Sequence, residues 1–213
     1  MAIPQAHLQP RQKPSPLMPK LGMHPIRRDQ LIRATFETID RVGLADATVA
    51  EIAGRAGLSS GIVSHYFGGK DGLLNAAMRQ VLRQLRDAVA SRTAAAAPEP
   101  RAQLRAIIDG NFDPSQVSAT AMRVWLTFWA ASMHDAALHR LQRSNDRRLY
   151  SNLSYQFQRA LPLQEARKAA RGLAAMIDGL WLRGSLAGGE FDVAQARQIA
   201  YEYLDYHLPK DAH

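Results

Sequence analysis

Apolar side chains recur along most of this 213-residue chain at the spacing of amphipathic helices. In the first segment, Ile32, Phe36 and Ile39 fall on one helical face, and no alternating stretch of β-branched residues predicts a strand. Glycine, proline and capping residues divide the pattern into segments. The expected helices cover residues 25–42, 48–56, 60–67, a long segment from about 70 to a hinge at 94–100, 101–110, 115–133, 136–160, 163–187 and 193–207. The predicted fold class is all-α.

Two of these helices are short and are joined by a glycine turn, which makes them a candidate helix-turn-helix. Thr48 and Glu51 have the spacing of a capping box, and Ser59 is a suitable N-cap for the second helix. The residues expected on or near the exposed side of that second helix are Ser60, Gly61, Ile62, Ser64, His65 and Tyr66. Such small and hydrogen-bonding side chains suit a helix that enters the DNA major groove. A helical hairpin inside an ordinary bundle fits the same pattern.

The charge balance is compatible with an anionic partner, although charge alone favours an ordinary soluble basic protein. Lys and Arg number 27 against 19 Asp and Glu, which gives a net charge of +8 and a pI near 10.2. A basic pI of this size is typical of nucleic-acid-binding proteins but does not prove the function. Thr48 and Lys70 stand at predicted helix N-termini, which favour phosphate binding, and Arg28 stands where a basic arm could touch the DNA backbone or minor groove.

Several function classes are disfavoured. The chain has no cysteine, so thiolate chemistry and disulfides are excluded. No nucleotide-binding, nucleophile-elbow or metalloprotease motif occurs, and the histidines lack metal-ligand spacing, so neither an enzyme nor a bound cofactor is expected. No long apolar run predicts a membrane span, and the N-terminus lacks the apolar core of a secretion signal. A cytoplasmic protein is therefore expected, with binding to a membrane surface through a basic helix as an alternative.

Residues 31–78 resemble the N-terminal domain of TetR-type transcriptional repressors. The elements that carry the resemblance are Gly43, Thr48-Val49, Ile52-Ala53, Ala56-Gly57, Ser59, Gly61, Tyr66-Phe67, Lys70 and Leu73-Leu74. Ser64 departs from the pattern, since many members carry an aromatic residue there. The resemblance implies a homodimer that binds double-stranded operator DNA. It also implies a helix-turn-helix domain at 20–70 and a helical effector-binding and dimerisation domain at 71–213. Residues 1–19 contain five prolines and few large apolar side chains, so a disordered leader is expected there.

Further segments resemble a subgroup of that family, the choline-responsive repressors of glycine betaine synthesis. The segments are MPKLGMHPIRR, GLSSGIVSHYF, GNFD, VWLTFWAASMH and AAMIDGLWLRGSLAGG. This resemblance implies repression of the genes for choline uptake and oxidation, relieved by choline or a related quaternary ammonium ligand. A TetR-type repressor that answers a different effector is the main alternative.

A choline-type cation is recognised by aromatic faces and nearby carboxylates. Trp125 and Trp129 are one helical turn apart, and Asp178 and Trp181 share another helix. Asp178 stands in an apolar run, so it needs a partner, which could be a ligand cation or an arginine such as Arg123 or Arg183. Phe112 is a weaker candidate, and core packing explains the aromatic residues equally well.

The last two helices are the usual dimerisation elements of the family. The apolar stripe Leu173, Met176, Ile177 and Leu180 needs a partner, either in a second subunit or within the monomer.

Overall fold

The computed structural model describes residues 23–187 and 191–208, and every regular element in these ranges is a helix. The expected leader at 1–19 lies outside the described residues. The helices are α1 (Met23–Asp46), α2 (Val49–Arg55), α3 (Gly61–Phe67), α4 (Lys70–Ala95), α5 (Pro100–Asn111), α6 (Pro114–Val117), α7 (Ala119–Ser132), α8 (Ala136–Gln158), α9 (Leu163–Leu186) and α10 (Val193–His207). The predicted all-α class is confirmed.

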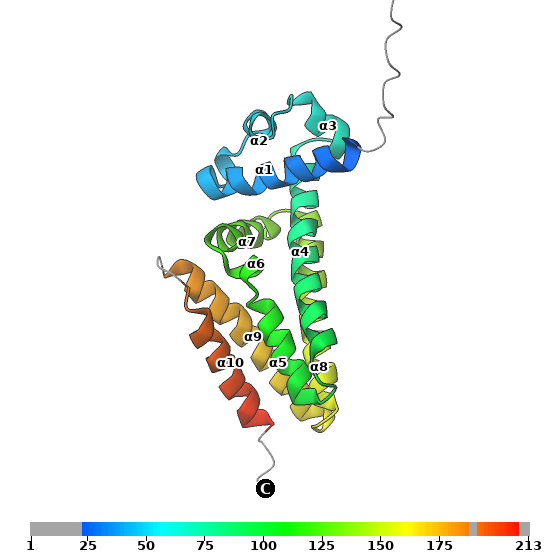
Figure 1. Ribbon diagram of the computed structural model, residues 1–213, viewed down its shortest axis with the longest axis vertical. Coiled ribbons are helices and arrows are strands. Elements are labelled where there is room, and N and C mark those ends of the chain that lie inside the picture. The colour runs from blue at the N-terminus through cyan, green and yellow to red at the C-terminus, as the bar shows by residue number, and fades with distance from the viewer. Residues whose placement is uncertain (1–22, 188–190, 209–213) are drawn as a thin grey trace, which may run out of the picture.

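The long helix α4 connects the two ends of the molecule (Figure 1). Helices α1, α2 and α3 lie together at its N-terminal end. Further along, α4 packs against α5 and α8, while α9 packs against α8 and α10. Helix α7 lies beneath α1, and these two helices pack extensively against each other. The small N-terminal unit therefore rests on α4 and α7.

Two chain breaks shape this arrangement. Gly43 has a positive φ of 75°, which interrupts α1 as expected, although a helical turn continues to Asp46. The single helix expected over 115–133 is wrong, because Ser118 adopts an extended conformation and separates α6 from α7. The Ser118 side chain accepts a hydrogen bond from the Ala121 amide at 3.3 Å, as an N-cap does. This break turns the one-turn helix α6 relative to α7.

The backbones of α3 and α4 approach each other very closely where the two helices join. A Cβ at Gly72 would lie 1.8 Å from the Phe67 carbonyl oxygen, so no larger residue fits there without moving the backbone. The left-handed Gly68, at φ 74°, ends α3 and returns the chain into α4. The orientation of α3 is therefore fixed by α4 as well as by α2.

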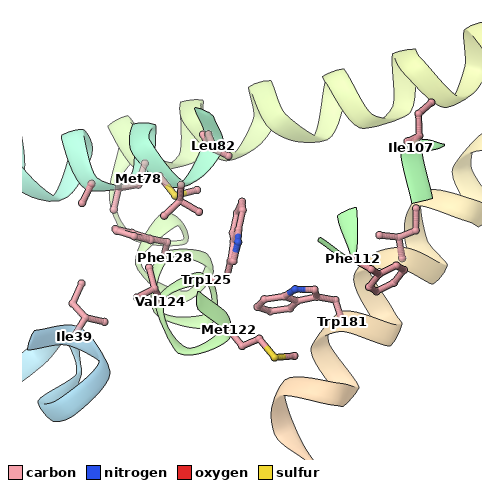
Figure 2. Packing of buried hydrophobic residues seen from close by; sticks show 14 of the residues in the cluster. Ile39, Met78, Leu82, Ile107, Phe112, Met122, Val124, Trp125, Phe128 and Trp181 are labelled. Atoms are coloured by element: carbon pink, nitrogen blue, oxygen red, sulfur yellow. The ribbon is translucent and has the colours of Figure 1, made fainter. Parts of the chain in front are cut away.

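A continuous apolar core runs from the N-terminal unit into the larger one (Figure 2). Leu173 and Ile177 are buried in this core, so these two members of the predicted apolar stripe pack within the monomer and do not await a second subunit. The large apolar side chains exposed on α9 and α10 are instead Leu163, Leu182, Leu186, Ile199 and Tyr206. No helix in the described ranges is long and apolar enough to cross a membrane.

Candidate functional sites

Helix α3 presents a polar face to solvent. Gly61, Ser64 and His65 are exposed along one side of the helix, and Ser59 and Ser60 are exposed just before it. Val63 on the opposite side is fully buried. Ile62 and Tyr66, which were also expected near the exposed side, are half-buried and pack against the core. The face offers hydroxyl and imidazole groups that can pair with base edges.

The caps of the two short helices differ from expectation in part. Thr48 caps α2 by accepting a hydrogen bond from the Glu51 amide at 3.1 Å, as predicted. The Glu51 carboxylate does not close the capping box, because it pairs with Arg41. Ser59 is not the N-cap of α3, since the helix begins at Gly61 and Ser60 takes that position without a side-chain bond. The hydroxyl groups of Ser59 and Ser60 are thus not engaged in capping.

Arg28 and Lys70 are turned toward the protein. The Arg28 Nη1 atom donates to the Tyr66 carbonyl oxygen at 2.6 Å, and its guanidinium lies 4.4 Å from the centre of the Phe67 ring. A cation at these last carbonyls of α3 also suits the helix dipole. Lys70 Nζ lies 3.5 Å from the Leu44 carbonyl oxygen, at the N-terminus of α4. Both cations brace the N-terminal unit in the free protein.

A second site lies in the larger unit, where all three tryptophans meet. The ring centres of Trp129 and Trp181 are 5.1 Å apart, and Trp125 lies 6.2 Å from Trp129 and 6.3 Å from Trp181. The ring planes are tilted or edge-on to one another, and Figure 2 shows the Trp181 ring extending from α9 toward Trp125. Sequence reasoning could place these residues on helices but could not show that α7 and α9 bring them together.

The tryptophans line a small pocket with Asp178. The complete lining is Leu85, Asn111, Gln116, Trp125, Trp129, Asn145, Leu149, Ile177, Asp178 and Trp181. Only about 30 Å³ is open to the centres of water-sized molecules, which suffices for about two waters. A larger guest would have to move the walls apart. We call this pocket the tryptophan cage.

Asp178 has no arginine partner. Within the described residues it makes no hydrogen bond or ion pair, and Arg123 pairs with Asp40 instead. The surrounding protein, and after it the charge of Asp146, raise the pKa of the Asp178 carboxyl to about 6. The residue is nonetheless exposed to solvent in part, so the surrounding protein shields its carboxyl without enclosing it. An unpaired acid beside three aromatic rings is the chemistry that attracts an organic cation.

The cage also contains polar residues that sequence reasoning missed. The Trp125 Nε1 atom donates to Gln116 Oε1 at 3.1 Å, and Gln116 is buried. Trp129 Nε1 is buried and has no acceptor within the described chain. Asn111 and Asn145 belong to the lining as well. Gln116 could not be found from sequence, because its orientation depends on the unpredicted break at Ser118.

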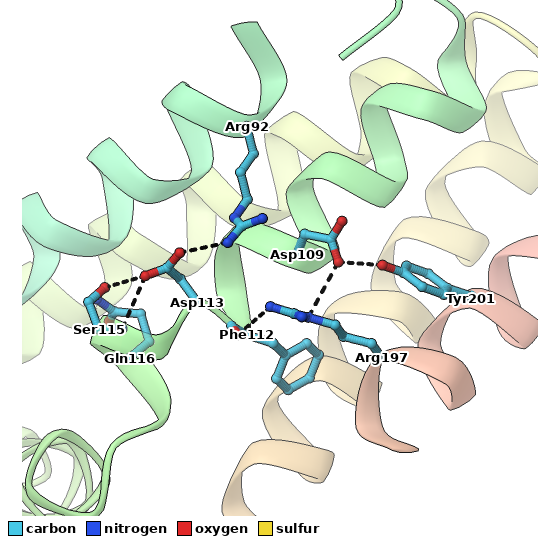
Figure 3. Close-up of polar contacts among 8 residues, drawn as sticks. All are labelled: Arg92, Asp109, Phe112, Asp113, Ser115, Gln116, Arg197 and Tyr201. Atoms are coloured by element: carbon cyan, nitrogen blue, oxygen red, sulfur yellow. Dashed lines mark hydrogen bonds and ion pairs between the residues drawn. The ribbon is translucent and has the colours of Figure 1, made fainter. Parts of the chain in front are cut away.

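Phe112 lies outside the cage. Its side chain is fully buried, with its ring centre 6.1 Å from that of Phe191, and the picture of the core places it away from Trp125. Its carbonyl oxygen accepts from Arg197 Nη2 at 2.7 Å (Figure 3). Phe112 therefore serves packing at the end of α5.

A polar network ties α5 to its neighbours (Figure 3). Asp109 accepts from the Tyr201 hydroxyl and lies 3.4 Å from Arg197, so α10 is bound to α5. Burial, followed by the bond to Asp109, raises the pKa of Tyr201 to about 12. Asp113 caps α6 and pairs with Arg92 at 2.8 Å. The network fixes the α5–α6 corner from which Gln116 enters the cage.

The two sites are connected through α7. On one side, α7 carries Trp125 and Trp129. On another, Thr120 donates to Asp40 Oδ2 at 2.9 Å and Arg123 donates to Asp40 Oδ1. The bond from Arg123 is the main cause that lowers the pKa of Asp40, so the carboxylate stays charged. Since Asp40 belongs to α1, a shift of α7 would displace α1 and with it the N-terminal unit that contains α3.

In the described ranges, no group of histidine and carboxylate side chains is arranged to hold a metal ion.

Two family models match the chain. Residues 31–77 match a model described as bacterial regulatory proteins, tetR family, and residues 100–209 match one described as BetI-type transcriptional repressor, C-terminal. Among curated proteins, the chain is 70% identical over 191 residues to the HTH-type transcriptional regulator BetI of Stenotrophomonas maltophilia, covering 90% of this chain and 97% of that protein. It is 66% identical to the HTH-type transcriptional regulator BetI 1 of Chromohalobacter salexigens, covering 91% and 96%.

Solved structures share the fold. A putative transcriptional regulator from Pseudomonas aeruginosa PAO1 superposes with a TM-score of 0.71 at 28% identity, covering 87% of this chain and 92% of that one. A putative transcriptional regulator from Saccharomonospora viridis, solved in complex with choline, gives a TM-score of 0.75 at 20% identity, covering 85% and 97%.

Proposed function

The chain belongs to the TetR family of bacterial transcriptional regulators, with a BetI-type C-terminal part, and is a DNA-binding repressor, not an enzyme; we propose that choline or a close quaternary ammonium relative is its effector. Regulators of this family bind operator DNA and small-molecule ligands and act as dimers. We further propose that its targets are the genes for choline uptake and oxidation to glycine betaine.

The observation that carries the effector proposal is the tryptophan cage. A quaternary ammonium group offers no N–H donor, so it is held by aromatic faces and by negative charge. Trp125, Trp129 and Trp181 supply the faces and Asp178 supplies the charge. The Trp129 Nε1–H has no partner in the described chain, so it could donate a hydrogen bond to a ligand oxygen such as the hydroxyl of choline. That a regulator sharing this fold was solved with choline is consistent with the assignment.

The DNA-reading surface proposed is the exposed side of the helix-turn-helix, within residues 20–70. The proposed contacts are Arg28, Thr48, Ser59, Ser60, Gly61, Ile62, Ser64, His65, Tyr66 and Lys70. Ser64 and His65 face outward from α3 and are suited to base edges, whereas Thr48 and Lys70 at helix N-termini are suited to phosphates. Residues 71–213 would bind the effector and form the dimer.

Helix α7 would transmit the effect of ligand binding to the DNA-binding unit and so release the repressor from DNA. Widening the cage for a ligand shifts Trp125 and Trp129, and the bonds from Thr120 and Arg123 to Asp40 carry that shift to α1. Two recognition helices of a dimer must lie about 34–36 Å apart to reach successive major grooves. A ligand that favours another spacing lowers DNA affinity through a coupling of about 1–3 kcal/mol, a five- to 150-fold loss.

Titration calorimetry with choline and with its neutral isostere 3,3-dimethyl-1-butanol tests the effector. The two have the same shape, so a cage that recognises charge binds choline at least about tenfold more tightly. Trp129→Ala should remove choline binding while DNA binding persists, with Trp129→Phe as the milder variant that keeps an aromatic face. Equal affinity for both compounds, or choline binding unaltered by Trp129→Ala, would show that the effector site lies elsewhere.

A further inference from the structure

The tryptophan cage adjoins a second, larger hollow. This groove has a volume of about 430 Å³ and lies between α4, α5 and α8. Leu85, Asn111, Asn145 and Leu149 line both the cage and the groove, so the two are adjacent. A ligand in the cage would therefore have its far end at or in the groove.

The two hollows differ in charge. The cage is lined by Asp178 and by no basic side chain. The groove is lined by Arg86 and Arg148, and no aspartate or glutamate contributes to its wall in the described part of the chain. Its other polar lining consists of neutral amide and hydroxyl side chains, which can donate hydrogen bonds. A negative site and a positive site thus share a wall.

Arg148 is the side chain best placed to use this polarity. It makes no hydrogen bond or ion pair within the described residues, whereas Arg86 is engaged with Asp87 at 2.8 Å. Arg148 follows Asn145 by three residues on α8, so the two lie on one helical face about 4.5 Å apart along the axis. Asn145 belongs to both hollows. The free guanidinium therefore lies about one turn from the cage.

We propose that the groove binds the anionic group of a zwitterionic quaternary ammonium ligand, either a phosphate monoester or a carboxylate, whose cation occupies the tryptophan cage. Arginine binds both kinds of anion through paired N–H donors, which gives orientation as well as attraction. Because the two hollows carry opposite charges, they should bind a zwitterion, which has both a positive and a negative group, more tightly than a simple cation. This inference rests on the proposed cation-binding role of the cage and adds the chemistry of the ligand's other end.

The test is titration calorimetry of the full-length protein with choline, phosphocholine, glycine betaine and inorganic phosphate. At least one of the two zwitterions should bind about tenfold more tightly than choline, and Arg148→Gln should abolish that advantage without changing choline affinity. Phosphocholine and glycine betaine distinguish a phosphate from a carboxylate. Arg147→Gln is the matched control, because Arg147 is an exposed neighbour on α8 that does not line the groove.

The outcomes separate this inference from the proposed function. If choline binds but neither zwitterion binds better, or if Arg148→Gln leaves the advantage intact, the groove assignment is overturned and the cage stands. If a zwitterion binds through Arg148 and choline does not bind, the groove assignment stands and choline is not the effector. If no quaternary ammonium compound binds, both are overturned.

Discussion

Asp178 is an acid in surroundings that penalise its charge. The surrounding protein and the neighbouring charge of Asp146 both favour the protonated form, and no described arginine offsets them. Such a residue costs stability and is retained where the charge serves a function. A bound cation would relieve the penalty, because it supplies the missing opposite charge. The residue thus links the stability of the protein to ligand binding.

A pH titration of choline binding tests this role. Because the pKa of Asp178 is about 6, the carboxylate is charged at pH 7.5 and largely neutral at pH 5. Choline affinity should therefore fall as pH drops through 6, by up to about tenfold per pH unit. Asp178→Asn should bind weakly at both pH values, with no pH dependence from this group. A pH profile unchanged by Asp178→Asn would contradict the assignment.

The same substitution has an expected effect on stability. A pKa raised above the ordinary value of 3.8 means that the residue's contribution to folding is full below about pH 4 and is lost as pH rises through about 6. Asp178→Asn should therefore raise Tm at pH 7 and leave it nearly unchanged at pH 4. Thermal melts at the two pH values check this, and a lower Tm at pH 7 would mean that the carboxylate is paired in the folded protein.

On the DNA side, a base-reading residue and a phosphate-binding residue should behave differently. Lys70→Ala should weaken binding to all sequences and reduce the salt slope by about one. His65→Ala should instead change the preference at one operator position by about 1–3 kcal/mol and leave nonspecific binding unaltered. Anisotropy titrations against operator and scrambled DNA at several salt concentrations compare the two. Uniform weakening by both variants would remove His65 from the base-reading face.

At the scale of elements, helix periodicity predicted most of the fold, while the site depended on features that periodicity does not carry. The extents of α9 and α10 follow directly from apolar spacing and glycine or proline boundaries. The break at Ser118 was missed, since serine occurs inside helices as well as at N-caps and the helical pattern continues across it. Gln116 was missed with it, and Phe112 was wrongly grouped with the cage because the chain's turn after α5 cannot be read from spacing.

Helix α7 should couple the two sites through Asp40. Asp40→Asn removes the charge that holds Arg123. We expect choline affinity to stay within about twofold, while the effect of choline on DNA affinity falls from the five- to 150-fold range toward none. Glu37→Gln is the matched control, because Glu37 is exposed on α1 and faces Arg55, not α7. Paired ligand and DNA titrations measure both quantities, and full coupling in Asp40→Asn would mean that the signal takes another route.

At the scale of the whole molecule, repression requires two copies, since one recognition helix reads only one half-site. Exposed Leu182 and Leu186 are one turn apart on α9, and Ile199 is exposed on α10. Such apolar side chains on neighbouring helices are suited to a second subunit. Dimerisation through α9 and α10 therefore stays a prediction. The side chains proposed for the contact are the exposed Leu182, Leu186 and Ile199 and not the buried Leu173 and Ile177.

Leu186→Arg tests that surface. A buried charge at a subunit contact should yield monomers and lower operator affinity by about a hundredfold, because the second half-site no longer contributes. Met133→Arg is the control, since Met133 is exposed at the end of α7 and belongs to neither α9 nor α10. Sedimentation and circular dichroism should show folded monomers for the first variant and folded dimers for the control. A dimeric Leu186→Arg would move the interface elsewhere.

Choline-sensitive repression is tested by an anisotropy titration of the protein against labelled DNA from upstream of its own coding sequence. It is run at two salt concentrations, with and without choline. We expect saturable, sequence-selective binding that choline weakens five- to 150-fold. Selective binding that choline leaves unchanged would contradict the effector assignment, and the absence of selective binding at either salt concentration would contradict the role of α3 on that DNA.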